Sequence, residues 1–354
     1  MHLSEKKRII PVSDWPFSEH SLSSSSNFHR EQVQNDENDM RHIKGQECAK
    51  RALEISAAGS HNVLMVGPPG SGKTLLARAF STLLPKLILK ESLEVSKVYS
   101  VIGRLNAEVP LIRQPPFRSV HHSASASSII GGGSFPRPGE ISLAHKGALF
   151  LDELAEFPQH VLETLRQPLE DHCITIGRAS GSATFPAHFT LIAAMNPCPC
   201  GYLGDSEQHC ICGSSQILQY RKKLSGPLLD RIDLFITVSR TKIDSLVASE
   251  DAEPSKKIRD RIQKARDIQE KRFYDTPFST NSEMPISFLK RFCELDTLSL
   301  RLIKEAMKSL HLSNRGYSRV LKISRTIADL EGSEKITEKH IAEALQYRPR
   351  EFVS

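Results

Sequence analysis

The stretch that decides the fold is residues 67–74, which read Gly67-Pro68-Pro69-Gly70-Ser71-Gly72-Lys73-Thr74. The apolar run Asn62-Val63-Leu64-Met65-Val66 precedes it, and residues 75–80 continue in a helical pattern. Glycines at this spacing let backbone N–H groups surround phosphates, and the following helix presents its positive end to the same charge. Lys73 is placed to reach the β- and γ-phosphates, and the Thr74 hydroxyl to ligate Mg²⁺. The stretch therefore predicts a nucleoside-triphosphate-binding loop between a strand and a helix.

Length and composition limit the class of protein. A chain of 354 residues with 39% hydrophobic residues is long enough for two packed domains. Residues 1–40 are rich in serine and other polar residues without an apolar period, which predicts a disordered polar tail. No apolar run is long enough to span a membrane, and the N-terminus lacks a secretory-signal core, so we expect a cytoplasmic protein. A net charge of +6 permits nucleic-acid binding without demanding it.

Two acids end a second apolar strand. Residues 147–154 read Gly147-Ala148-Leu149-Phe150-Leu151-Asp152-Glu153-Leu154. Asp152 can complete the Mg²⁺ shell with Thr74, and Glu153 can orient and polarise the attacking water. The alternative is a strand that ends at a helix N-cap with favourable acids. Together with the phosphate loop, the acids favour a hydrolytic site.

A third apolar strand, residues 189–195, ends in Asn196-Pro197. Ligand-binding residues of an open parallel sheet gather at the carboxyl ends of its strands. Asn196 is therefore predicted to sense the γ-phosphate or the water, and the alternative is a simple Asx-Pro turn. We expect an α/β core over 41–240, a linker at 241–257 and an all-helical lid domain at 258–350.

The order of these motifs resembles that of AAA+ ATPases, in particular the ComM/YifB group of magnesium-chelatase-like proteins. The motifs that carry the resemblance extend from residue 43 to residue 348 and read KGQ, PFRS-HH-AS, GGG, RPGEISLAHKG, LFLDEL, RQPLED, AAMNPCPCG, SGPLLDRID and RTIADL. The resemblance implies an AAA+ core with a mostly parallel sheet and helices on both faces, ATP and Mg²⁺ as cofactors, and a homohexameric ring. It also implies that Ile43 and Gln46 lie against the adenine.

By the same resemblance Arg231 looks like an arginine finger for the neighbouring subunit's ATP, and Arg315 like a second sensor on the lid. Exposed arginines are common, so a surface Asp-Arg pair at Arg231 and a solvated helix start at Arg315 remain alternatives. Arg319, one turn beyond Arg315, is a second candidate for the lid contact. An arginine supplied across an interface is worth about 10³ to 10⁵ in phosphoryl-transfer rate. We therefore expect an isolated monomer to be a poor ATPase.

Four of the seven cysteines lie close together in the sequence, as Cys198, Cys200, Cys210 and Cys212. Such clustering in a cytoplasmic chain indicates a metal before a disulfide. Four thiolates could bind one tetrahedral Zn²⁺, with His209 as a substitute ligand. The alternative is a set of free or redox-active thiols, because the CxC spacing is tighter than the usual CxxC.

Two segments are candidates for contact with a substrate. The long segment between the phosphate loop and the acid pair, at about 86–146, reads as an insertion, which in the resembled group projects towards the pore of a ring. Its His121-His122 pair has no further ligand at suitable spacing, which favours packing over a metal site. Residues 173–178 and 182–186 predict a hairpin. Arg178 on it could follow a DNA backbone without base specificity, and the alternative is an ordinary edge hairpin.

The resemblance implies a ring-shaped DNA motor, a helicase of ComM type that acts in recombination or natural transformation. Alternatives are a magnesium-chelatase-like ATPase that remodels a protein or inserts a metal, and a shortened ATP-binding protein with little activity. The cysteine cluster and the detailed motif match favour DNA, because no sequence element identifies a tetrapyrrole or a chelatase partner. The ComM/YifB group usually carries a Lon-protease-like domain ahead of the ATPase, and only the polar tail precedes it here. We therefore expect a shortened relative.

Overall fold

The computed structural model describes residues 37–105, 110–133, 136–178, 181–241, 252–310 and 312–348. The polar tail expected for residues 1–40 lies almost wholly outside these ranges, as does most of the linker expected for 241–257. The described residues from Asn38 onward form one compact unit.

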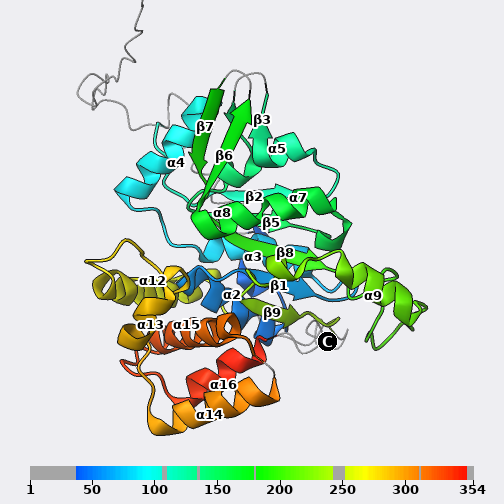
Figure 1. Cartoon of the computed structure of the whole chain (residues 1–354), viewed down its shortest axis with the longest axis vertical. Helices are drawn as coiled ribbons and strands as arrows, with labels where there is room; N and C mark the ends of the chain where they lie inside the picture. Colours follow the sequence, from blue (N-terminus) through cyan, green and yellow to red (C-terminus); the bar gives the residue numbers. More distant parts are fainter. Residues whose placement is uncertain are drawn as a thin grey trace, which may run out of the picture. The chain divides into compact units, whose positions relative to one another are not determined.

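A five-stranded sheet lies at the centre of this unit (Figure 1). Its strands run in the order β2-β5-β8-β1-β9, and each of the four pairings is parallel. The strands are β1 (Val63–Val66), β2 (Phe117–Val120), β5 (Ala148–Leu151), β8 (Thr190–Met195) and β9 (Leu234–Thr237). The expected α/β class with a parallel sheet is confirmed.

Both faces of the sheet are buried, which explains why its central strands are continuous apolar runs. Alternate residues of β8 enter two different hydrophobic clusters, with Ile192 and Ala194 in one and Leu191 and Ala193 in the other. Helices lie on both sides of the sheet (Figure 1), and they supply further members of these clusters. They include α2 (Glu47–Gly59) and α3 (Lys73–Leu83) in the first cluster and α7 (Gln159–Thr164) and α8 (Arg166–Asp171) in the second.

The C-terminal helices share the first of these clusters with the sheet. They are α12 (Ser255–Arg272), α13 (Ile286–Phe292), α14 (Thr297–Ser309), α15 (Asn314–Leu330) and α16 (Glu338–Gln346). The expected helical region is therefore confirmed, although its first helix begins at Ser255 and not at residue 258. The reason is a cap from the core, because Asp39 Oδ1 accepts the Ser255 N–H at 3.0 Å and the Ser255 hydroxyl accepts the Met40 N–H at 2.8 Å.

Shorter elements surround the sheet. They are η2 (Met40–His42), α4 (Leu89–Val101), α5 (Ala126–Ile130), β3 (Gly131–Gly132), β4 (Arg137–Pro138), α6 (Glu140–Leu143), η3 (Leu154–Glu156), β6 (Cys173–Arg178), β7 (Gly181–Pro186), α9 (Ser214–Lys222), α10 (Gly226–Leu229) and η4 (Asn281–Glu283). Strands β6 and β7 pair in the expected antiparallel hairpin, with the Thr175 and Thr184 hydroxyls 3.0 Å apart. The segment expected as an insertion is one only in part, because β2 within it is the edge strand of the main sheet.

A buried ion network joins the C-terminal helices. The Asp329 side chain in α15 is fully buried, and its Oδ2 accepts from Arg272 of α12 at 2.7 Å and from the Asn281 amide at 2.8 Å. Its Oδ1 accepts from Arg325 Nε at 3.1 Å. A buried carboxylate with two guanidinium partners is stable only while every partner stays in place.

We predict that Asp329→Ala lowers the free energy of unfolding by about 3–5 kcal/mol, because it leaves buried guanidinium charges unpaired. Urea denaturation followed by far-UV circular dichroism measures this loss. The matched control is Glu305→Ala, which removes an exposed pair with Arg301 on α14 (N–O distance 3.1 Å) and should cost about 0.5 kcal/mol or less. Equal losses in the two variants would contradict a stabilising role for the network.

Candidate active site

The phosphate loop, the acid pair and Asn196 meet at the carboxyl edge of the sheet. The loop follows β1, Asp152 follows β5 and Asn196 follows β8, and these strands are neighbours in the order β5-β8-β1. The Thr74 hydroxyl donates to Asp152 Oδ2 at 2.8 Å, and the Lys73 ammonium donates to Asn196 Oδ1 at 3.3 Å. Residues predicted from three separate segments of the sequence thus lie in direct contact.

The backbone of the loop is shaped to receive an anion. Gly72 has φ +90°, in the left-handed region that favours glycine, and it is the N-cap of α3. The first turn of α3 therefore presents its unpaired N–H groups to the inside of the loop. The loop is also joined to the neighbouring strand, because the Gly67 N–H donates to the Met195 carbonyl at 3.2 Å.

Lys73 is buried inside this loop. Its ammonium donates to the carbonyls of Gly67 and Pro68 at 2.7 and 2.8 Å. Burial lowers the pKa of Lys73 to about 8, against the opposing effect of the Asp152 and Glu153 charges. Lys73 therefore changes its protonation state near the pH of a typical assay.

Glu153 points in a different direction from Asp152. Its backbone has φ 53° and ψ 48°, a left-handed conformation that costs about 1–2 kcal/mol for a residue other than glycine. Its Oε2 lies 2.8 Å from Nδ1 of His122, which follows the edge strand β2. The ligand atoms of His121, His122 and Glu153 all lie within 4.8 Å of one another. The expectation that the histidine pair lacks a third candidate ligand is therefore wrong, because pairing of β2 with β5 brings Glu153 beside it.

Ile43 and Gln46 lie on the far side of β1 from the acids. The Gln46 amide donates to the Ser239 carbonyl and, at 3.4 Å, to the Thr241 hydroxyl, which joins the start of α2 to the segment after β9. Ile43 packs against the first hydrophobic cluster. Because β9 is the neighbour of β1, this segment lies at the same sheet edge as the phosphate loop. The contact of Ile43 and Gln46 with the adenine stays a prediction.

Arg231 and Arg315 lie at the opposite edge of the sheet. Asn62, immediately before β1, donates from its side-chain amide to the Arg231 carbonyl at 2.9 Å. The Arg231 guanidinium forms an ion pair with Glu170. Strand β1 has four residues, so Gly67 at the start of the phosphate loop is five residues after Asn62, which at about 3.3 Å per residue is about 17 Å. Arg231 therefore does not contact the phosphate loop of its own chain.

The two lid arginines differ in exposure. Arg315 Nη1 lies 3.4 Å from Asp230 Oδ2, and its side chain is 60% exposed. Arg319 Nε lies 3.4 Å from Asp233 Oδ1, and its side chain is only 11% exposed. Burial alone would raise the pKa of Asp233, but the hydrogen bond and charge of His61 and the charge of Arg319 hold it at about 2. Arg319 is thus committed to a contact within the chain, whereas Arg315 is open to a second molecule.

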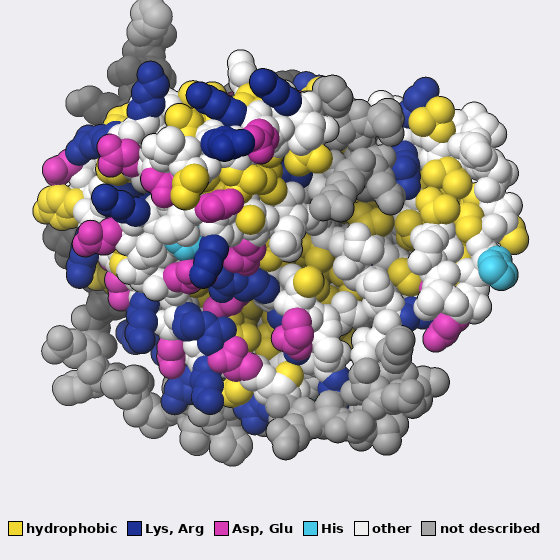
Figure 2. Space-filling view, turned by 90° about the horizontal axis from the view of Figure 1, so that it is seen from below, with side chains coloured by type: hydrophobic (Ala, Val, Ile, Leu, Met, Phe, Trp, Pro, Cys, Tyr) yellow, Lys and Arg dark blue, Asp and Glu magenta, His cyan; other side chains and the backbone are white. Residues whose placement is uncertain are grey.

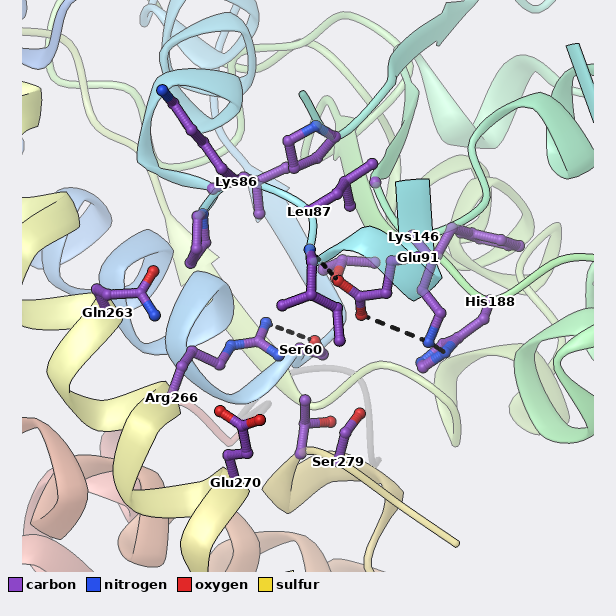
Figure 3. Close-up of a pocket in the computed structure, with 18 of the residues that line it drawn as sticks. Ser60, Lys86, Leu87, Glu91, Lys146, His188, Gln263, Arg266, Glu270 and Ser279 are labelled. Atoms are coloured by element: carbon purple, nitrogen blue, oxygen red, sulfur yellow. Dashed lines mark hydrogen bonds and ion pairs between the residues drawn. The ribbon is translucent and has the colours of Figure 1, made fainter. Parts of the chain in front are cut away.

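A cavity of about 190 Å³ opens at this amino edge, between residues that precede β5 and β8 and helix α12 (Figure 3). Its wall carries both signs of charge, with Lys146 beside Glu91 and with Arg266 and Glu270 on the same helix (Figure 3). Arg266 donates to the Ser60 hydroxyl at 2.8 Å, and Lys146 lies 3.8 Å from Glu91, so these cations already have partners. The phosphate loop lies at the other edge of the sheet, and this cavity is therefore not the nucleotide site.

The four clustered cysteines converge after Asn196. Cys198 Sγ lies 3.4 Å from Cys200 Sγ and 3.6 Å from Cys210 Sγ, and all four sulfur atoms, including that of Cys212, lie within 4.8 Å of one another. Four thiolates held about 2.3 Å from one tetrahedral Zn²⁺ lie about 3.8 Å apart. The cluster could therefore bind zinc. His209 is exposed and does not belong to it.

Arg178 is the residue for which a contact with DNA is predicted. Arg178 is the last residue of β6, but its side chain lies outside the part of the chain that the structure describes. Within the described ranges, no helix combines the length and the apolar composition that crossing a membrane requires.

Sequence reasoning missed three contacts at the site. The partner of Glu153 is His122, the partner of Arg231 is Glu170, and Asn62 holds the Arg231 segment to the sheet. Asn62 also accepts the Leu191 N–H at 2.8 Å through its side-chain oxygen. A polar residue directly before a buried strand was the available signal for Asn62, because a buried amide there needs backbone partners.

A parallel sheet in this order, with a phosphate loop after its central strand, an acid pair after a neighbouring strand and a helical region behind it, defines an AAA+ ATPase. Residues 39–246 match the family described as magnesium chelatase, subunit ChlI, and residues 252–348 match the family described as its C-terminal part. The chain therefore belongs to the magnesium-chelatase family of AAA+ ATPases, in its ComM/YifB group.

Two bacterial proteins of the ComM/YifB group are similar to this chain in sequence. Competence protein ComM of Haemophilus influenzae is 46% identical over 312 residues, which are 88% of this chain and 60% of ComM. The uncharacterised protein YifB of Escherichia coli is 42% identical over 320 residues, with the same coverage of 88% and 60%. The chain thus spans about 60% of the length of these curated relatives.

ATP and Mg²⁺ are the cofactors that the family implies, and the described residues fit them. The oxygen atoms of Thr74 and Asp152 are hard ligands of the kind that Mg²⁺ prefers. Lys73 and the N–H groups of the loop suit a polyphosphate. Thr74 and Asp152 would hold the Mg²⁺, whose charge would neutralise part of the charge of the phosphates.

We predict that binding of Mg-ATP takes up protons at alkaline pH. Free Lys73 has a pKa of about 8 and is half protonated at that pH, whereas phosphate charge favours its ammonium form. Uptake should therefore be near zero at pH 6.5, reach about half a proton at pH 8 and rise further at pH 9. Titration calorimetry in buffers of different ionisation enthalpy measures it.

The matched control is Lys73→Arg, whose guanidinium stays charged throughout this pH range. If this variant binds nucleotide, it should do so without the alkaline proton uptake. The same uptake in both proteins would show that another group is responsible.

Proposed function

We propose that this chain hydrolyses ATP within a ring of identical subunits, and that the ring moves along DNA as a helicase of ComM type. The observation that carries the proposal is the position of the arginines. The phosphate loop lies at the carboxyl edge of the sheet, and Arg231 and Arg315 lie at the amino edge. A complete hydrolytic site therefore needs two copies of the chain.

The carboxyl edge supplies the groups that act on the nucleotide. Lys73 exchanges the Gly67 and Pro68 carbonyls for phosphate oxygens, and Thr74 and Asp152 hold the metal. Glu153 accepts a proton from the attacking water, and Asn196 holds that water or the γ-phosphate by its amide. The positions of Asp152, Glu153 and Asn196 at the carboxyl edge of the sheet support these roles.

The amino edge supplies the groups that act on a neighbour. Arg315 is largely exposed, whereas the Arg231 side chain is 11% exposed and forms an ion pair with Glu170, whose side chain is 54% exposed. Because Glu170 is exposed to solvent and carries a single charge, a triphosphate of higher charge can displace it from Arg231. Arg319 keeps its contact with Asp233 and serves as structural support.

DNA is the proposed substrate because of the relation to a competence protein and the position of the hairpin. The C-terminal helices, at the left of Figure 2, show Lys and Arg interleaved with Asp and Glu, which does not favour a polyanion on that face. The hairpin β6–β7 lies at the other end of the core from these helices (Figure 1). We propose that it contacts the DNA backbone, with Arg178 as one of the contacting residues.

A second candidate function is remodelling of a protein or insertion of a metal, since both matched families are described as chelatase subunits. It predicts the same hydrolytic site and the same ring. The two candidates differ in what stimulates turnover.

We predict that Arg231→Ala binds ATP but loses about 10³-fold or more in turnover, because the charge it supplies to the neighbour's phosphates is gone. Lys73→Ala should be inactive because it does not bind nucleotide. A mixture of the two should regain activity, since an Arg231→Ala subunit can receive Arg231 from a Lys73→Ala neighbour. Normal turnover by Arg231→Ala alone would rule out its role across the interface.

We also predict that ATP turnover per subunit rises with protein concentration and is stimulated by single-stranded or forked DNA. Measurement of phosphate release across a concentration series tests this, with Glu153→Gln as the background control. Concentration-dependent turnover that is indifferent to DNA would favour the protein-remodelling or metal-insertion alternative. Turnover that is independent of concentration, down to amounts at which the chain is a monomer, would contradict the shared site.

A further inference from the structure

We propose that the four clustered cysteines bind one Zn²⁺ and that this zinc knuckle, residues 198–212, holds the phosphate loop and Asn196 in position. Nucleotide affinity then depends on a metal that never touches the nucleotide. The inference deepens the proposed ATPase function and rests on it for the nucleotide readout, whereas the metal itself can be measured separately.

The knuckle lacks the usual means of holding a polypeptide in one shape. Residues 202–213 contain no helix or strand, and none of their apolar residues is buried; Ile211, between two of the cysteines, is 87% exposed. Ordering a segment costs about 1–2 kcal/mol per residue in backbone entropy, and little apolar burial offsets it here. A cross-link is therefore required, and a structural Zn²⁺ supplies it in small segments of this kind.

The sulfur atoms are arranged for a metal and not for disulfides. The sulfur of Cys210 lies 3.6 Å from both Cys198 Sγ and Cys200 Sγ, far from the bond length of about 2.05 Å of a disulfide. The backbone N–H of Cys200 points at Cys212 Sγ, at an N–S distance of 3.4 Å. Such a donor stabilises the negative charge of a thiolate, which is the form that binds Zn²⁺.

The first turn of the knuckle, at Gly201, contacts the phosphate loop directly. Gly201 has φ +88°, and a Cβ at this position would lie 2.7 Å from Cδ of Pro69 and 3.9 Å from Cγ of Asn196. Glycine is therefore required, because any side chain would push the turn away from the loop. Cys198 is fully buried and stands two residues after Asn196. A metal bound by Cys198 thus fixes the chain beside the phosphate sensor.

The second turn of the knuckle, at Asp205, lies on the side of the site where the adenine of the nucleotide is expected. Asp205 Oδ2 lies 2.9 Å from Arg240 Nε, and the Asp205 side chain is only 1% exposed. Arg240 directly follows Ser239, whose carbonyl accepts the hydrogen bond from Gln46. The knuckle therefore contacts both ends of the nucleotide site, and loss of the metal would loosen both.

The first test is the metal content of the full chain. We expect one Zn²⁺ per chain by atomic absorption after purification without added chelator. Replacement by Co²⁺ should give thiolate-to-metal charge-transfer bands and the intense d–d bands of a tetrahedral site. Absence of stoichiometric zinc, together with failure to bind Co²⁺, would overturn the proposal whatever the ATPase activity.

The second test links the metal to the nucleotide. Cys210→Ser should lose the zinc and bind a fluorescent ATP analogue about tenfold more weakly, a loss of about 1.4 kcal/mol. Cys210→His, which creates a Cys₃His site, should keep both zinc and affinity. Cys173→Ser, outside the cluster, is the control and should match the wild type in both. Circular dichroism checks that each variant is folded.

Gly201→Ala separates the contact from the metal. It leaves all four ligands in place but forces the turn away from Pro69, so we expect full zinc content with nucleotide affinity reduced about tenfold. Wild-type affinity in both Cys210→Ser and Gly201→Ala would overturn the coupling. If the wild type itself binds no nucleotide, the ATPase proposal fails and with it the coupling, whereas zinc binding is still decided by the first test.

Discussion

Parallel pairing of β1 on both of its sides is the constraint on which the rest of the structure depends. Val63 is the register partner of Ile192 on one side and of Leu234 on the other. One end of β1 carries the phosphate loop, and the other end carries Asn62, which holds the Arg231 segment. Because both sheet faces are also buried, the strand cannot tilt or slide without breaking the core. The phosphate loop and Arg231 are therefore held apart within one subunit, and in the proposed ring a second subunit supplies the arginine.

The sequence was sufficient for those parts of the site that follow buried strands. The three central strands are continuous apolar runs, and each ends in polar residues whose chemistry suits phosphate or Mg²⁺. The parallel-sheet rule then places the loop, Asp152 and Asn196 at one edge without knowledge of any contact. The contacts of Thr74 with Asp152 and of Lys73 with Asn196 agree with this prediction. Helices of the C-terminal region were equally accessible, because their apolar positions recur at helical spacing.

The parts that could not be predicted depend on pairing between distant segments. Strand β2 contains Arg118 and Ser119 and is an edge strand, so it lacks the apolar run that marks its neighbours. Arg118 is satisfied by Glu140, with Nε 2.6 Å from the carboxylate, a contact that no local pattern indicates. Because the sequence indicates an insertion where β2 lies, it does not predict that His122 and Glu153 are neighbours. The position of Arg231 at the amino edge could not be predicted either, because a sequence motif indicates a role but not the edge of the sheet on which the residue lies.

The charged groups of the site share one further property, which is that each has a partner within the chain. Lys73 binds loop carbonyls, Thr74 binds Asp152, Glu153 binds His122 and Arg231 binds Glu170. Unpaired charges in such positions would be costly, so internal partners stabilise the isolated subunit. The carboxylates of Glu153 and Glu170 are 47% and 54% exposed, whereas their partners His122 and Arg231 are 31% and 11% exposed. In the proposed ring, phosphate, water and a neighbouring subunit would compete with these internal partners. Nucleotide binding and subunit assembly would then act on the same set of pairs, and this common set would couple one event to the other.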